Sequence, residues 1–65
     1  MCESAVYLMK GSEKSLIKAE TSKILIEDGM VVCIGAFGEK IEVENAELSE
    51  INLMKHEIIL RPKKG

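Results

Sequence analysis

The sequence predicts an all-β protein, with six to seven short strands in a small, strongly curved antiparallel sheet or barrel. Three features of the 65 residues lead to this prediction. Turn-forming residues recur at short intervals, the apolar runs between them are short, and polar and apolar residues alternate with a period of two in the second half of the chain. Because so short a chain cannot form two stacked sheets of ordinary size, a curved sheet or barrel is the more economical arrangement.

The first expected strands, residues 5–9 and 15–17, lie on either side of a Gly-Ser turn. Between residues 13 and 27 the frequent Glu, Lys and Ala also favour a helix. The positions one helical turn beyond the apolar pair Leu16-Ile17 are polar, however, and would interrupt an apolar stripe. We therefore expect two short strands in this region.

A hairpin is expected at Asp28-Gly29, which separates apolar residues 24–26 from residues 30–34. Asp-Gly is a strong hairpin signal because both central residues of the tight turn favour a positive φ. Residues 40–44 follow a glycine-rich turn and alternate between polar and apolar, which is typical of a half-buried antiparallel strand.

The last two strands are expected at residues 50–53 and 56–60, joined by a short turn. Residues 1–61 should then form one small β-barrel domain, and residues 62–65 a basic C-terminal tail. Pro62 has no N–H to donate to a strand ladder, so we expect the last strand to end before it.

The size of the chain bears on its partners and location. A domain of this length buries only about 60% of the surface that its unfolded chain exposes, so a homodimer is expected. The longest apolar run, residues 30–34, is far shorter than the roughly 20 residues that cross a bilayer. The first residues also lack the pattern of a secretory signal, and we expect a cytoplasmic protein without a membrane partner.

The charge balance disfavours RNA as a partner. Nine Lys and Arg face eleven Asp and Glu, which gives a net charge of −2, and only one Tyr and one Phe are present. Proteins that bind nucleic acids use clustered cations and aromatic platforms for bases. The residues that would contact phosphates are Lys10, Lys14, Lys18, Lys23 and the Arg61 to Lys64 tail.

The chain carries no recognisable hydrolase, zinc-protease or phosphate-loop motif, so we expect no enzymatic activity. Cys33 lies in the most apolar run, which favours a buried structural thiol. His56 follows a predicted turn and has no other His or Cys at ligand spacing. A solvated turn histidine is favoured there, and a lone imidazole that joins a site across a dimer is the alternative.

Cys2 is the candidate metal ligand, because a thiol at a chain end has no packing role. The amine of Met1, the next amide and the Cys2 thiolate form a compact chelate once they are deprotonated. Square-planar nitrogen and thiolate donors suit Ni(II) or Cu(II), whereas structural zinc sites usually take four Cys or His side chains. One chain supplies too few strong ligands, but two chains related by a two-fold axis would close a four-ligand site. An inert N-terminal cysteine is the alternative.

The Met1-Cys2-Glu3-Ser4 start, the Phe37-Gly38-Glu39 turn and the closing segments 50–53 and 58–60 resemble the CooT family of small nickel-binding proteins. The resemblance spans nearly the whole chain. It implies a small SH3-like β-barrel, a homodimer, and Ni(II) bound through Cys2 near the dimer interface. It also implies a link to supplying nickel to carbon monoxide dehydrogenase, the nickel-enzyme client. Similar sequences have also been labelled RNA-binding on the basis of their fold.

Three functions therefore compete. The first is a Ni(II) carrier, or metallochaperone, whose site is the paired N-termini. The second is a small RNA-binding β-barrel, whose binding would weaken steeply with added salt, whereas thiolate coordination would respond to pH and to loss of Cys2. The third is a domain whose exposed strand edge docks another protein.

Overall fold

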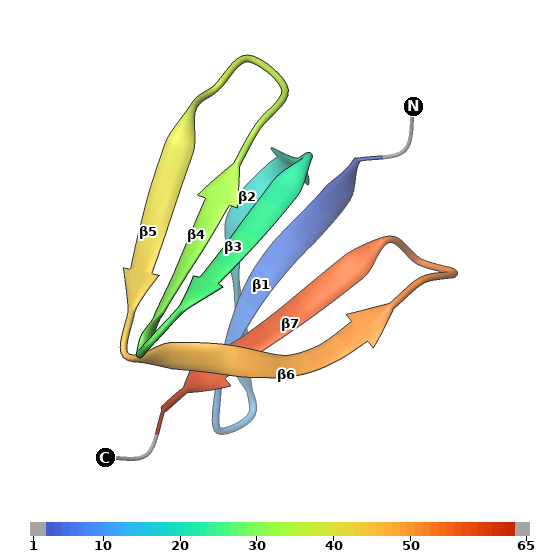
Figure 1. The fold of residues 1–65 in the computed structure, drawn as a ribbon. Coiled ribbons are helices and arrows are strands. Elements are labelled where there is room, and N and C mark those ends of the chain that lie inside the picture. The colour runs from blue at the N-terminus through green and yellow to red at the C-terminus, as the bar shows by residue number, and fades with distance from the viewer. Residues whose placement is uncertain (1–2, 64–65) are drawn as a thin grey trace.

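The computed structural model describes residues 3–63, which form seven β-strands and no helix (Figure 1). Within this range there is accordingly no helix long and apolar enough to cross a membrane. The predicted all-β class is confirmed. The strands are β1 (Ser4–Lys10), β2 (Glu13–Thr21), β3 (Lys23–Glu27), β4 (Met30–Ile34), β5 (Lys40–Glu44), β6 (Ala46–Asn52) and β7 (Glu57–Pro62).

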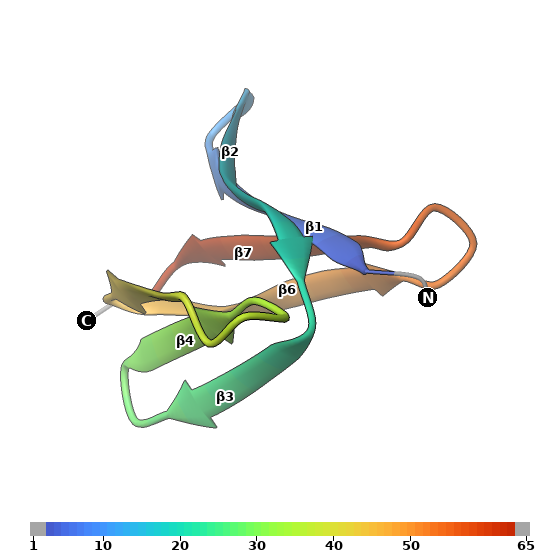
Figure 2. The same cartoon turned by 90° about the horizontal axis from the view of Figure 1, so that it is seen from above.

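The strands form two small sheets, which Figure 2 shows from above. One sheet has four strands in the order β2-β1-β7-β6, and the other has three in the order β3-β4-β5. The sheets are not closed into a barrel. All pairs are antiparallel except β1 and β7, which run parallel and place Val6 opposite Ile58. The purely antiparallel pairing expected from the strand pattern is therefore wrong for this one pair, which joins the two ends of the described chain.

The predicted Asp28-Gly29 hairpin joins β3 to β4, and Glu27 pairs directly with Met30 across the turn. Gly29 has a φ of 75°, a conformation that glycine adopts without steric cost. The turn between β1 and β2 is as tight, because Lys10 pairs with Glu13. Both turns lie where the sequence predicted a break between strands.

The segment with mixed helix and strand preferences forms two strands that belong to different sheets. β2 runs to Thr21, the chain bends at Ser22, and β3 continues in the smaller sheet. The bend is held by the Ser22 N–H, which donates to the Ile34 carbonyl at 2.8 Å. A second corner, Asn45, connects the sheets between β5 and β6. Its N–H donates to the Gly29 carbonyl at 2.7 Å.

The C-terminal strands are longer than the sequence predicted. β6 starts at Ala46 instead of residue 50, and β7 includes Pro62 as its last residue. Pro62 pairs with Ala46 at the end of the ladder, where a missing N–H is tolerated. The Lys63 N–H then donates to the Asn45 carbonyl at 2.7 Å, so the expected tail begins as a bonded extension of the sheet.

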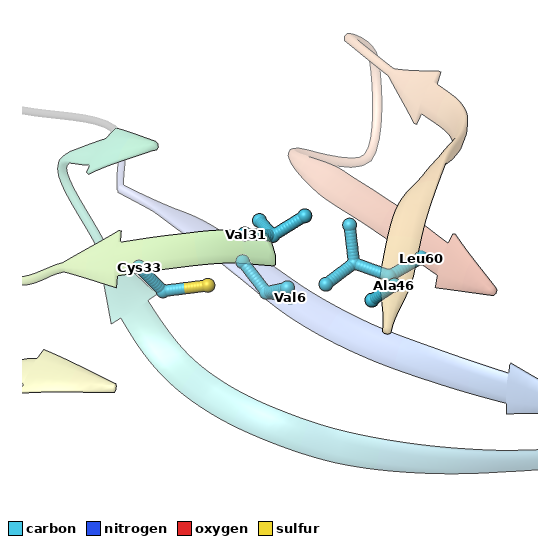
Figure 3. Packing of buried hydrophobic residues seen from close by; sticks show 5 residues of the cluster. All are labelled: Val6, Val31, Cys33, Ala46 and Leu60. Carbon is cyan, nitrogen blue, oxygen red and sulfur yellow. The ribbon is translucent and has the colours of Figure 1, made fainter. Parts of the chain in front are cut away.

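The hydrophobic core lies between the two sheets (Figure 3). Its buried members come from four strands in both sheets: Val6 (β1), Val31 and Cys33 (β4), Ala46 (β6) and Leu60 (β7). Ile24 and five other half-buried apolar residues pack around them. The core is small, as expected for a chain of this length.

Candidate metal centre

The two predicted metal ligands, Met1 and Cys2, lie outside the residues that the structure describes. The structure does define where the N-terminal segment joins the fold. β1 starts at Ser4, which pairs with Thr21 of β2 on one side. On the other side the Ala5 N–H donates to the His56 carbonyl at 2.9 Å. The strand that carries the N-terminal segment is therefore held from both sides at its first two residues.

Two polar groups lie close to this junction. The hydroxyl of Thr21 is buried and has no hydrogen-bond partner within residues 3–63. His56 is exposed in the turn between β6 and β7 and has a positive φ of 55°. The expected solvated turn histidine is therefore observed. Its position beside the start of β1 could not be read from the sequence, because it depends on the parallel pairing of β1 with β7.

Cys33 is a structural thiol, as its apolar surroundings predicted. Its side chain is fully buried in the core. Burial raises the pKa of the Cys33 thiol, and the nearby Lys18 ammonium opposes this shift less strongly. A buried and protonated thiol is a poor ligand for a metal ion that arrives from solution, because the thiolate is the ligand form.

A cluster around Glu39 was not found by sequence reasoning. The Glu39 carboxylate accepts a hydrogen bond from the Phe37 N–H at 3.1 Å and one from the Lys18 ammonium at 3.2 Å. Backbone hydrogen bonding and then Lys18 hold the pKa of Glu39 below its ordinary value. A Cβ at Gly35 would overlap this carboxylate, so glycine there leaves room for the Glu39 side chain in the turn between β4 and β5. Gly35 and Gly38 indicated a turn in the sequence, but no sequence pattern indicated the ion pair between Lys18 and Glu39.

The structure holds no compact cluster of metal-binding side chains in its described part. Within residues 3–63, no group of three or more His, Cys, Asp or Glu side chains is placed to bind a metal ion. A metal site that used these residues would need ligands from the N-terminal segment or from a second chain.

Four basic residues, Lys14, Lys55, Arg61 and Lys63, line a groove of about 780 Å³ on the four-stranded sheet. Lys14, Arg61 and Lys63 each pair with a carboxylate, at 3.5, 2.7 and 3.3 Å. The Lys14 ammonium also lies 4.3 Å from the centre of the Tyr7 ring. These cations are partly neutralised within the chain, which does not favour phosphate binding.

Comparison with known proteins places the chain in a family. The family model described as CO dehydrogenase accessory protein CooT matches residues 1–61. No curated protein sequence matches the chain significantly. Among solved structures, that of a provisionally assigned CooT from Carboxydothermus hydrogenoformans is similar, with a TM-score of 0.84 at 19% identity. The match covers 97% of this chain and 100% of the other. Because the family model spans nearly all of the sequence, this chain belongs to the CooT family of CO dehydrogenase accessory proteins.

Proposed function

We propose that the protein is a cytoplasmic Ni(II) carrier that supplies nickel during maturation of CO dehydrogenase. In this proposal the metal is the cargo, and the Met1-Cys2 segments of a homodimer hold it. The observation that carries the proposal is the family match, which includes both residues and describes an accessory protein of a nickel enzyme. A carrier of this kind needs no catalytic group of its own.

The donor set of the N-terminal segment suits this cargo. Met1 offers an amine, the next peptide offers an amide nitrogen, and Cys2 offers a thiolate. Nitrogen and thiolate donors are preferred by Ni(II) over the oxygen donors that bind magnesium or calcium. Two segments related by a two-fold axis would provide six such donors, more than the four that a square-planar site requires.

The burial of Cys33 supports the assignment to Cys2. The chain has two cysteines, and Cys33 is enclosed by the core with a raised thiol pKa. Binding through Cys33 would require the core to open, which costs free energy before any metal bond forms. Cys2 is the thiol that can bind nickel without unfolding the domain.

The test is a titration of the reduced protein with Ni(II), followed by ultraviolet and visible absorption. The wild type is compared with Cys2→Ser and with Cys33→Ala as the matched control. We expect a thiolate-to-nickel band that saturates at one metal for every two chains. It should vanish in Cys2→Ser and persist in Cys33→Ala. A wild type without the band, or a band that survives Cys2→Ser, would refute the proposal.

RNA binding remains the second candidate. A direct comparison is the affinity for single-stranded RNA at low and moderate salt, because phosphate contacts weaken steeply as salt increases. We expect no salt-sensitive RNA binding. Tight binding that survives loss of Cys2 would favour the RNA module over the nickel carrier.

A further inference from the structure

The turn between β4 and β5, residues 35–39, displays an aromatic ring in solvent. Phe37 is 95% exposed, which makes it the most exposed large apolar side chain within residues 3–63. Single exposed apolar residues are common on protein surfaces and need no function. Phe37 differs from such residues because the chain around it is held in one conformation by several hydrogen bonds.

Backbone and side-chain groups both hold the turn. The Gly38 N–H donates to the Gly35 carbonyl at 3.1 Å, and the Gly35 N–H donates to the Glu39 carbonyl at 2.8 Å. The Phe37 N–H donates to the Glu39 carboxylate at 3.1 Å. The Lys18 ammonium, whose side chain is only 12% exposed, donates to the same carboxylate at 3.2 Å. Because Lys18 belongs to β2, the turn is fastened to a strand of the other sheet.

Two glycines fit the turn to these contacts. A Cβ at Gly35 would overlap the Glu39 carboxylate, and Gly38 has a φ of 85°, which side chains other than glycine rarely adopt. These contacts fix the backbone of Phe37 and leave its ring in solvent. A side chain that is presented on a fixed backbone loses little conformational freedom on binding, which favours its use as an interface anchor.

Two lysines lie at the base of this turn. Lys23 and Lys40 pair with Ile34 from its two sides, so the three residues share one row and one face of the three-stranded sheet. Both lysines are exposed, and neither belongs to an ion pair among residues 3–63. The negative charge of Glu39, by contrast, is paired with Lys18. The exposed ring is therefore accompanied by unpaired positive charge, which suits an acidic surface on a partner.

The turn lies at the same end of the molecule as the start of β1, at the top of Figure 1. A short series of contacts connects the two. Ser4 pairs with Thr21, the next N–H, that of Ser22, donates to the Ile34 carbonyl at 2.8 Å, and the turn follows at Gly35. A protein that binds the turn is therefore close to the point where the N-terminal segment joins the fold.

A second copy of this chain is a poor partner for Phe37. The groove of about 780 Å³ on the four-stranded sheet is lined mainly by charged and polar side chains. A smaller cavity of about 240 Å³ is lined by Glu47, Arg61, Pro62 and Lys63. Neither suits an aromatic ring. Insertion of Phe37 into another part of a copy would also be a heterologous contact, which forms rings or open chains instead of a closed pair.

We propose that Phe37 is the anchor through which this protein docks on nickel-deficient CO dehydrogenase, where it enters an apolar pocket rimmed by carboxylates. The inference rests on the proposed function, in which that enzyme receives the nickel. Interfaces are enriched in aromatic residues at their centre, and an anchor seated in a pocket carries much of the binding energy. Lys23 and Lys40 face the acidic rim, where charges mainly speed the encounter.

The test is the binding of the reduced, metal-free full chain to immobilised nickel-deficient CO dehydrogenase from the same organism, measured by biolayer interferometry. Phe37→Ser should raise the dissociation constant at least about 30-fold. Met54→Ser is the matched control, because Met54 is 91% exposed in another turn, and it should change the constant less than about threefold. Lys40→Glu should weaken binding at low salt, and its difference from wild type should shrink as salt increases.

Three results would overturn the proposal. The first is a wild type that does not bind the enzyme up to about 100 μM, and the second is equal binding of wild type and Phe37→Ser. The third is an altered association state of Phe37→Ser in sedimentation velocity, which would assign the ring to a contact between copies. Circular dichroism of each variant shows whether the fold is kept.

Docking and nickel binding are scored separately. Phe37→Ser should keep the nickel band of the wild type, because it leaves the N-terminal donors unchanged. Absent docking with a normal nickel band would overturn the docking inference alone. Absence of the band in the wild type would refute the nickel site, and Phe37-dependent binding to the enzyme, measured without metal, would still support the docking surface.

Discussion

The role of Cys33 as a core thiol can be tested by replacing its sulfur with a hydroxyl. Cys33→Ser puts a polar group at a fully buried position. The residues directly opposite on the neighbouring strands are Ile24 and Ile41, whose side chains offer no hydrogen-bond partner. These two neighbours therefore offer the hydroxyl no hydrogen bond to replace the hydration that it loses on folding.

The size of the effect follows from this environment. A buried polar group without a partner costs about 1–3 kcal/mol, and we expect a loss of about 2 kcal/mol in the free energy of unfolding. A chain of 65 residues is stabilised by only about 3–10 kcal/mol. The melting temperature should fall by about 8–16 °C. Cys33→Ala removes one heavy atom without adding a polar group and should cost only about 1 kcal/mol.

Thermal unfolding of the reduced, metal-free proteins, followed by far-ultraviolet circular dichroism, measures these differences. All samples need the same protein concentration, because dimerisation shifts the transition. A Ser variant that melts within about 2 °C of the wild type would show that the side chain is not buried without a partner. A folded Cys33→Ala protein that has lost the nickel band would show that Cys33 is a ligand.

Three further predictions concern the same fold. Because burial raises the pKa of Cys33, its protonated form stabilises the fold fully below the ordinary thiol pKa of about 8.5, and this stability is lost as pH rises through the raised value. Urea unfolding should therefore show a steeper alkaline loss for wild type than for Cys33→Ala, and parallel curves would contradict this. His56→Asn should keep both stability and the nickel band, whereas His56→Val should lose about 1–2 kcal/mol because a β-branched residue resists the φ of 55°. Equal stability of the two variants would contradict the positive φ of residue 56. Leu60→Ala, at a fully buried position, should lose about 2–5 kcal/mol in urea unfolding, and a loss below about 1 kcal/mol would place Leu60 outside the core.

Local signals in the sequence predicted most of the strands. The Asp28-Gly29 hairpin and the alternation of residues 40–44 depend on near neighbours, and both are confirmed. Between residues 13 and 27, where Glu, Lys and Ala also favour a helix, the expected two strands are confirmed. The prediction was correct because the apolar positions there do not form a helical stripe. The start of β6 at Ala46 was missed, since a corner at Asn45 replaces a longer loop there.

Long-range features could not be predicted in this way. The parallel pairing of β1 with β7 joins residues more than 50 positions apart, as Val6 and Ile58 show, and no local pattern encodes it. The division into two sheets depends on the bend at Ser22, a residue type that is equally common in ordinary turns. The same limit applies to the site. The apolar run around Cys33 predicted its burial, but the position of His56 beside the start of β1 follows only from the fold.

In the proposed nickel site, two chains share one nickel ion through Cys2. Native mass spectrometry of the reduced protein with a small excess of Ni(II) counts chains and metal ions in the same particle. We expect a species of two chains with one nickel ion for the wild type and for Cys33→Ala, and no nickel-bound species for Cys2→Ser. Nickel bound to a single chain, or retained by the Cys2→Ser variant, would contradict the shared N-terminal site.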